Sequence, residues 1–340
     1  MPNSFKKHEQ LLPLLAEPFK IEYMNQILDN PFPYSNTNKR YHTFSYATKE
    51  MYHHKVAKIP LNAGFTCPNR DGTKSVGGCR FCSSNGSGDT ILSAQSTLET
   101  QFTNNLKRAQ QKWPDCLGIP YFQSFSNTYA PLELLKKIYT PFYQRDDIVA
   151  IAIATRTDCF TEEQAKWFSK QEKTTWLEFG LQSIHDETAK AMNFAHSAQD
   201  AKKAIELCHR YHLKSCLHII NGLPNETEKM MLETVKFVAD LHPDAIKIHM
   251  LHLLDNSVLG QEWKQQPFDL LTLEQYVSIT CDQLEILPPE MIIERVTGDG
   301  LASDLLVPLW TQKKTIVANE IDKELLRRNS WQGKYYVANK

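Results

Sequence analysis

The stretch Gly64-Phe-Thr-Cys67-Pro-Asn-Arg-Asp-Gly-Thr-Lys-Ser-Val-Gly-Gly-Cys79-Arg-Phe-Cys82 gathers three cysteines in one loop, directly after a short apolar run at Val56–Asn62. Three thiolates can hold three irons of a four-iron cluster and leave the fourth iron open. The open iron can bind the amino and carboxylate groups of S-adenosylmethionine. The loop therefore predicts a 4Fe–4S cluster held by Cys67, Cys79 and Cys82.

A structural zinc site is the main alternative, because two thiols separated by two residues are common in zinc knuckles. Zinc needs a fourth ligand, and none follows at the usual spacing, although His53 or His54 can return to supply one. A thioredoxin-like redox pair is less favoured, because Cys79 and Cys82 do not open a helix in a small βαβ domain. The place of the loop, after the first strand of a barrel, favours the cluster.

Downstream of Lys55, short apolar runs alternate with stretches of helical periodicity, which is typical of a parallel sheet. The expected strands are Val56–Asn62, Ile119–Phe125, Ile148–Thr155, Thr175–Leu181, Ser215–Ile220, Ala245–Leu251 and Met291–Arg295. The expected helices are Pro131–Gln144, Glu162–Gln171, Ala198–Tyr211 and Thr227–Leu241. The sequence thus predicts an α/β fold, a partial (β/α)6 barrel of the TIM type, with its ligand site where the strands end.

Two extensions flank the expected barrel. Residues 1–38 are rich in leucine and end in a Ser-Asn-Thr-Asn linker, which indicates a helical segment docked on the barrel. Residues 39–300 form the barrel, and residues 301–340 a polar, partly helical C-terminal tail.

Composition excludes several classes of protein. With 38 basic and 39 acidic residues the net charge is −1, so no global positive field attracts nucleic acid. The start of the chain is polar and no stretch has the length of a membrane span, so we expect a cytoplasmic protein with no membrane contact. Eight cysteines then indicate free thiols or metal ligands rather than disulfides.

Strand alternation identifies the inward-facing side chains, because residues two apart share one face. In Trp176–Gln182 the leucines and Phe179 face the helices, so Glu178 and Gln182 point inward, and in Ala150–Ala154 small alanines leave room for a ligand. The same argument places inside the polar residues Gln123, Arg156, His218, Lys247, His249 and Arg295. A cavity explains this polar interior, and internal ion pairs, such as Glu178 with Lys247 or Arg156, are the alternative.

The cysteine loop resembles that of the YtqA/YhcC radical S-adenosylmethionine (SAM) family, relatives of the elongator catalytic subunit, in its long first gap and its C-x-aromatic-C end. That gap departs from the three-residue spacing of most radical SAM enzymes but suits this family. The similarity continues through Tyr121–Tyr129, Thr155–Cys159, Glu178–Ser183, His218–Pro224, Lys247–His249 and Arg295–Asp299. It covers Lys39 to the C-terminus and implies an enzyme that cleaves SAM reductively to a 5′-deoxyadenosyl radical.

The resemblance also implies roles around bound SAM. The Gln123–Asn127 segment stands in place of the usual Gly-Gly-Glu turn that holds the methionyl amine, and Asn221 and Gly222 lie near the adenosine. The residues expected to bind the cofactor are Gln123, Ser124, Asn127, Arg156, Glu178, Gln182, Ser183, Asn221, Lys247 and His249. No catalytic residue can be assigned to the substrate radical.

Resemblance to this family further implies tRNA as the substrate. The reaction would convert the 5-carboxymethylaminomethyl side chain of the wobble uridine, or of its 2-thio form, to 5-aminomethyl. The implied partners are an electron donor such as flavodoxin or ferredoxin, and a tRNA methyltransferase that acts on the product.

Residues 38–58 offer modest support for RNA binding, because aromatic side chains alternate there with cations and one acid, Glu50. The cations considered for phosphate contact are Lys39, Arg40, Lys49 and Lys55. Cations can contact phosphates while aromatic faces stack on splayed bases. The alternative, a solvated segment leading into the first strand, is favoured by charge alone.

Other functions remain open on the residues alone. A radical SAM enzyme that acts on a small metabolite is the rival within the enzyme class. A zinc-stabilised nucleic-acid-binding module and an iron–sulfur redox sensor are the rivals outside it. Metal analysis identifies a zinc-stabilised module, and detection of 5′-deoxyadenosine excludes a redox sensor.

Overall fold

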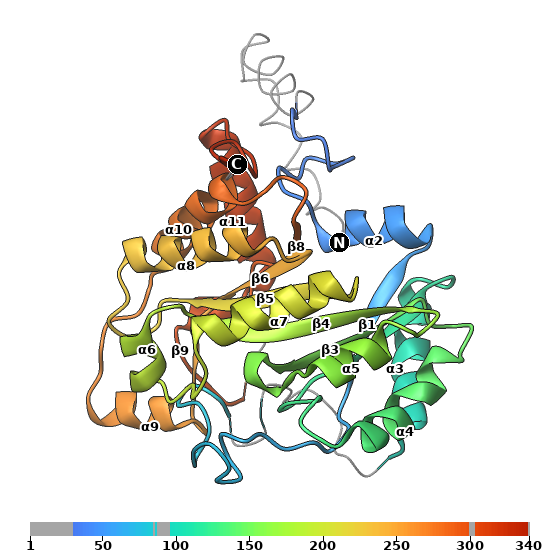
Figure 1. Ribbon diagram of the computed structural model, residues 1–340. Coiled ribbons are helices and arrows are strands. Elements are labelled where there is room, and N and C mark those ends of the chain that lie inside the picture. The colour runs from blue at the N-terminus through green and yellow to red at the C-terminus, as the bar shows by residue number, and fades with distance from the viewer. Residues whose placement is uncertain (1–29, 84–85, 87–95, 299–302, 339–340) are drawn as a thin grey trace, which may run out of the picture.

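The computed structural model describes residues 30–83, 86, 96–298 and 303–338. Seven parallel strands form one curved sheet in which each strand pairs with its predecessor (Figure 1). They are β1 (Val56–Leu61), β2 (Leu117–Phe122), β3 (Ala150–Arg156), β4 (Thr174–Gln182), β5 (Lys214–Asn221), β6 (Ala245–Met250) and β8 (Ile292–Arg295). This sequential order is that of a partial TIM-type barrel. The predicted α/β fold class and all seven predicted strands are confirmed, with ends shifted by a few residues.

Helices connect the strands. Those that follow strands of the sheet are α3 (Leu98–Lys112), α4 (Leu132–Tyr143), α5 (Glu162–Phe168), α6 (Asp186–Ala191), α7 (Ala198–Arg210), α8 (Glu228–Leu241), α9 (Val258–Gln265) and α10 (Leu273–Ile286). The helix α2 (Phe44–Tyr52) precedes β1, and α11 (Lys314–Arg327) follows β8. A short antiparallel ribbon joins β7 (Leu253–Leu254) to β9 (Leu305–Val307). The four predicted helices are confirmed as α4, α5, α7 and α8.

Local signals explain where several helices begin. Thr161, Ser197 and Thr272 each form a capping box, in which the side chain accepts from the backbone three residues on and a Gln or Asp side chain returns the bond. Such boxes provide hydrogen-bond acceptors for backbone N–H groups that have no partner within the first helical turn. They fix the starts of α5, α7 and α10 close to the strand ends that line the site.

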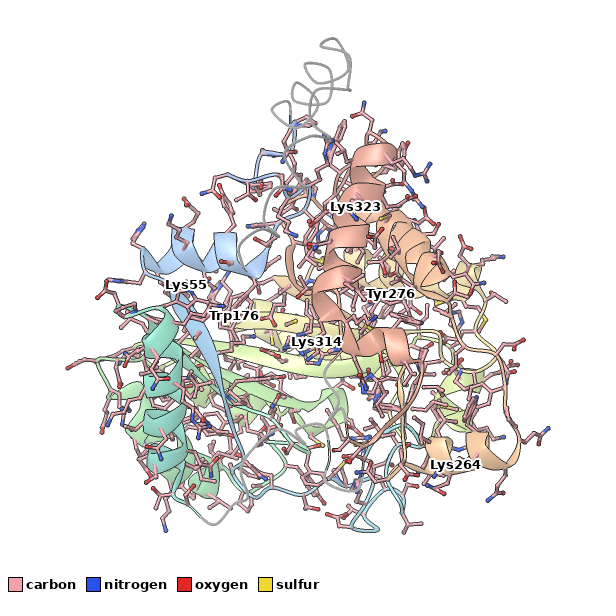
Figure 2. The ribbon with its side chains drawn as sticks, turned by 180° about the vertical axis from the view of Figure 1, so that it is seen from behind. Lys55, Trp176, Lys264, Tyr276, Lys314 and Lys323 are labelled. Carbon is pink, nitrogen blue, oxygen red and sulfur yellow. The ribbon has the colours of Figure 1, made fainter. Side chains whose placement is uncertain are left out.

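The inside of the sheet is divided into two layers. At the end where the strands begin, Trp176 packs with Ile119, Cys216 and the small side chains of Ala150 and Ala152. Trp176 is labelled in Figure 2. The expectation that these two alanines leave room for a ligand is therefore wrong, because the indole of Trp176 fills the space. Toward the ends of the strands the interior becomes polar, and Ala154 lines a cavity.

The extensions are only partly visible. Residues 1–29, where the N-terminal helical segment is expected, lie outside the described residues. The C-terminal tail contains α11, which packs on α10 through Arg328 and its ion pair with Asp282. Within the described ranges, no helix is both long and apolar enough to cross a membrane.

Candidate active site

Side chains from six strands of the large sheet and from the cysteine loop line one cavity of about 260 Å³, at the ends of the strands. All three cysteines border it. The other residues of its lining that the sequence predicted to lie inside are Gln123, Arg156, Glu178, Gln182, His218, Lys247, His249 and Arg295. The strand-alternation argument thus identified a set of side chains that the fold brings together.

The cysteine loop is held by a segment more than a hundred residues away. The side-chain amide of Asn193 donates to the carbonyl oxygens of Val76 (3.1 Å) and Gly78 (2.8 Å), and its carbonyl oxygen accepts from Ser75 Oγ (2.9 Å). The buried side chain of Asn69 donates to the Asn193 backbone and, at 3.5 Å, to Cys79 Sγ. Asn193 has a φ of 55°, in the left-handed region that asparagine tolerates better than most residues. Hydrogen bonds from Asn193 and Asn69 therefore hold the cysteine loop in its conformation.

Arg156 borders the cavity and also binds the segment that contains Asn193. Its guanidinium is bidentate to Asp158 (both 2.9 Å) and also donates to the carbonyl oxygens of Phe194 (2.7 Å) and Ala195 (3.0 Å). Against the effect of burial, Asp158 raises the pKa of Arg156, and the thiols of Cys67 and Cys79 raise it further. A cation at this position suits the negative charge that three thiolates and their cluster carry.

Replacing Asn193 by alanine is expected to loosen the cluster, because the three hydrogen bonds of its side chain to the loop are each worth about 1 kcal/mol. Loss of such an outer support typically weakens a metal site about tenfold or more. Iron release to a chelator should therefore be roughly tenfold faster than in the unchanged protein.

Asn225→Ala is the matched control, because Asn225 is exposed and also has a positive φ, 67°. Both substitutions change an asparagine in the left-handed region, but only one removes contacts to the cysteine loop. Equal iron release from the two variants would show that backbone strain, and not the hydrogen bonds, governs cluster retention.

Glu178 occupies the centre of a buried ionic cluster. It forms ion pairs with Lys58 and Lys247 and accepts from His218 Nε2 at 3.1 Å. Glu294 pairs with the same two lysines, at 3.1 Å from Lys247. Burial alone would raise the pKa of Glu178, but Lys247, Lys58 and His218 outweigh it and hold that pKa well below its ordinary value. The internal ion pair between Glu178 and Lys247 is thus present. In place of the suggested pair with Arg156, Glu178 has an ion pair with Lys58 and a hydrogen bond with His218.

The turn after β2 contains polar atoms that suit a ligand. Among the described residues, Ser124 Oγ, Ser126 Oγ and Asn127 Oδ1 are buried and make no hydrogen bond within the protein. Ser126 borders the cavity, whereas the amide nitrogen of Asn127 donates to the backbone of Ser124 and Ala154. Buried polar atoms without partners are uncommon, so a polar ligand at this turn fits the site.

Two other residues assigned by resemblance are engaged elsewhere. Ser183 donates to the carboxylate of Glu226, and Asn221 exchanges two hydrogen bonds of 2.8 Å with the buried amide of Gln283. The described lining of the cavity includes neither of them, nor Ser124 and Asn127. Their roles in binding the cofactor remain predictions.

The sequence argument missed several side chains of the lining. His196 follows α6 and is half-buried, and burial and Arg156 lower its pKa to about 4. Its position on a loop after a strand end was the available signal, because such loops carry the ligand site of a barrel. Tyr121, Phe125 and Ser126 also border the cavity.

The basic segment before β1 divides into inner and outer parts. Arg40 is buried and Lys39 pairs with Asp322 of α11, whereas Lys49 and Lys55 are exposed. Figure 1 shows α2 and the cysteine loop at opposite ends of β1. Of the four cations considered for phosphate contact, Lys49 and Lys55 are therefore the exposed ones, and they lie on a face away from the cysteines.

Comparison with known proteins identifies the family. The model of the radical SAM superfamily matches residues 66–238, and that of the radical SAM C-terminal domain matches residues 243–327. The uncharacterized protein YtqA of Bacillus subtilis is 44% identical over 310 residues, which cover 91% of this chain and 96% of YtqA. The two family models together cover the three cysteines of the loop and every strand of the large sheet except β1.

More distant relatives share part of the chain. The tRNA uridine(34) acetyltransferase of Methanocaldococcus infernus is 29% identical over 154 residues, covering 44% of this chain and 29% of that protein. The structure of archaeal Elp3 from the same organism superimposes with a TM-score of 0.57 at 19% identity, covering 80% of this chain and 64% of that one, which supports the fold. The chain belongs to the radical SAM superfamily of enzymes, which use a 4Fe–4S cluster and S-adenosylmethionine, and within it to the YtqA/YhcC family.

Proposed function

We propose that this radical SAM enzyme modifies tRNA at the wobble uridine, shortening a 5-carboxymethylaminomethyl side chain to 5-aminomethyl. The observation that carries the proposal is the similarity to tRNA uridine(34) acetyltransferases. The cluster would be held by Cys67, Cys79 and Cys82, and the cofactor by the polar lining of the cavity. When bound, they would supply a radical that takes a hydrogen atom from the carbon between the side-chain nitrogen and the carboxylate. SAM would be the two-electron oxidant of that carbon, and water would then break the carbon–nitrogen bond, releasing the two-carbon unit as glyoxylate and leaving the amine.

The tasks of the chain itself are to orient the cofactor and substrate and to exclude water. Phe81 lies between two of the cysteines and packs edge-on against the buried ring of Phe194, with 5.9 Å between ring centroids. Phe81 and Phe125 both border the cavity, so apolar faces cover it beside the thiols. The ends of the strands supply the polar groups that would orient a charged side chain.

A strain lacking this protein is expected to accumulate the 5-carboxymethylaminomethyl form at the wobble position of its tRNA. Mass spectrometry of tRNA nucleosides measures this directly. Purified enzyme, given a reductant and SAM, should convert that nucleoside to the 5-aminomethyl form, with a flavodoxin or ferredoxin as the proposed natural donor. The product would then serve the proposed methyltransferase.

The control is the same strain complemented with the Cys79→Ala variant, which should not restore the product. An unchanged nucleoside profile, in a strain without a second route to the product, would contradict the tRNA proposal. Radical chemistry on a small metabolite would then be the better assignment.

A further inference from the structure

The side chain of Asn69 contacts one of the three cysteine sulfurs directly. Asn69 lies two residues after Cys67 and is fully buried. Its nitrogen Nδ2 donates to the backbone carbonyl oxygen of Asn193 and, at 3.5 Å, to the sulfur of Cys79. In the part of the chain that the structure describes, no other group donates a hydrogen bond to Cys79 Sγ. One buried amide therefore connects a cysteine of the loop with the segment that follows α6.

The neighbours of this amide determine its orientation. A carbonyl oxygen is an acceptor, and so is a cysteine sulfur that ligates iron, so the NH2 end of the side chain has to face both. The other end, Asn69 Oδ1, is buried and makes no hydrogen bond to any described residue. Turning the amide by 180° would place that oxygen against the two acceptors and remove both hydrogen bonds. The site thus favours an N–H···S contact with the Cys79 sulfur.

Hydrogen bonds on both sides of Asn69 hold it beside Cys79. Its backbone carbonyl oxygen accepts from the N–H of Gly78, the residue before Cys79, at 2.8 Å. The carbonyl oxygen of Asn193 that receives Asn69 Nδ2 belongs to the residue whose own side chain binds Gly78. Donor and sulfur are thus parts of one hydrogen-bonded unit, and their contact does not depend on a long, flexible side chain.

We propose that Asn69 raises the reduction potential of the iron–sulfur cluster through its N–H···S bond to the Cys79 thiolate. Reduction adds one negative charge, which the cluster shares with its thiolate ligands. A donor that points at one of these sulfurs therefore stabilises the reduced form more than the oxidised form. The bond is strengthened by its burial, because little solvent competes with it.

The proposed role is an indirect one. Asn69 is absent from the described lining of the cavity, so it acts through Cys79 and not on SAM or the substrate. The inference rests on Cys79 being a ligand of the cluster. It is independent of the substrate, and it would hold equally for an enzyme that acts on a small metabolite.

The test is a redox titration of the unchanged protein and of Asn69→Leu, both reconstituted anaerobically and without SAM. The electron paramagnetic resonance signal of the reduced cluster measures the midpoint potential. Leucine has nearly the shape of asparagine but no donor. A hydrogen bond to a charged group can change an equilibrium by about tenfold, so the potential of Asn69→Leu should be about 59 mV more negative.

The sign of the shift separates this bond from a change in solvent access. Water that enters beside the cluster also favours the more highly charged, reduced form, so it would move the potential of Asn69→Leu to more positive values. A positive shift, or an unchanged potential in a variant that retains its iron, would overturn the proposal.

Asn193→Gly is the matched control. Glycine adopts the φ of 55° at this position without strain, and the backbone carbonyl that binds Asn69 stays in place. The substitution removes only the three hydrogen bonds of the Asn193 side chain to the cysteine loop. We expect this variant to release iron faster and to keep its midpoint potential. An equal shift in both variants would show that loosening of the loop, and not the bond to sulfur, sets the potential.

A measurement on the unchanged protein decides the question if Asn69→Leu does not fold or retain iron. The protein is labelled with ¹⁵N only in the side-chain amides of asparagine, and the cluster is reduced. Pulsed electron paramagnetic resonance should then detect a coupling between the cluster spin and one labelled nitrogen, and the coupling should persist in Asn193→Gly. Absence of the coupling from the unchanged protein would exclude the bond from Asn69 to the Cys79 sulfur and with it the proposal.

Discussion

Alanine in place of Cys67, Cys79 or Cys82 is expected to remove the cluster and all formation of 5′-deoxyadenosine. The unchanged protein, reconstituted anaerobically, should hold about four irons per chain, because three thiolates bind three irons of a four-iron cluster. With one thiolate missing, only two irons of such a cluster keep a protein ligand, and the cluster is lost. Iron and sulfide analysis, with chromatography of the nucleoside product, measures both effects.

Cys159→Ala is the control for this experiment. Burial raises the pKa of the Cys159 thiol to about 12, and the side chain lies outside the described lining of the cavity. It should therefore keep its iron and its 5′-deoxyadenosine formation, as expected of an inert thiol. Full iron retention in a variant with alanine at all three of Cys67, Cys79 and Cys82 would contradict the cluster assignment. Stoichiometric zinc without iron in the unchanged protein would support the structural zinc site.

The parts of the site that sequence periodicity could predict are those set by short-range rules. The three cysteines share one loop, and Glu178, Gln182, Lys247 and His249 follow from the alternation of side chains along a strand. Each of these two patterns involves residues that are close together in the sequence. The strands, and the face of each that points inward, could be predicted for the same reason.

The rest depends on contacts between distant segments. Nothing near the cysteine loop indicates that Asn193 holds it, because 124 residues separate Asn69 from its partner in that segment. Lys58 was expected beside a basic surface segment, yet its side chain turns inward to Glu178 and Glu294. Arg40, from the same segment, is buried. Which carboxylate a lysine meets is decided by the curvature of the sheet, and periodicity contains no information about it.

The ionic cluster predicts a large loss of stability when Glu178 is replaced by alanine. Glu178 is fully buried, and its removal leaves Lys58 and Lys247 to share the one carboxylate of Glu294. Breaking a buried ion pair by removing one partner typically costs about 3–5 kcal/mol. The midpoint of thermal unfolding should therefore fall by something on the order of 5–10 °C. Glu320→Ala, which breaks the exposed pair with Lys323 on α11, should change stability by less than about 1 kcal/mol.

The pH dependence of this penalty follows from the lowered pKa of Glu178. A carboxyl whose pKa is depressed by folding adds stability above its unfolded value, about 4.3, and loses it as the pH falls toward the folded value. The difference between the unchanged protein and Glu178→Ala should thus be constant from neutral pH down to about 5 and shrink only in stronger acid. A penalty that shrinks already near pH 6 would mean that Glu178 is not held ionised by its lysines.

Comparison with Gln182→Ala separates a structural role of Glu178 from a role in binding. Gln182 borders the same cavity but, being uncharged, leaves no buried lysine without a counter-charge when it is removed. We expect Gln182→Ala to keep its unfolding midpoint and its iron and to bind SAM more weakly, as measured by equilibrium dialysis. Glu178→Ala should instead lose stability first, with any loss of SAM binding following from it. Glu178→Ala could instead keep its unfolding midpoint and lose only its affinity for SAM. In that case the Glu178 carboxylate of the unchanged protein would leave Lys58 and Lys247 and bind the cofactor, and the ionic cluster would be a ligand site rather than a stabilising one.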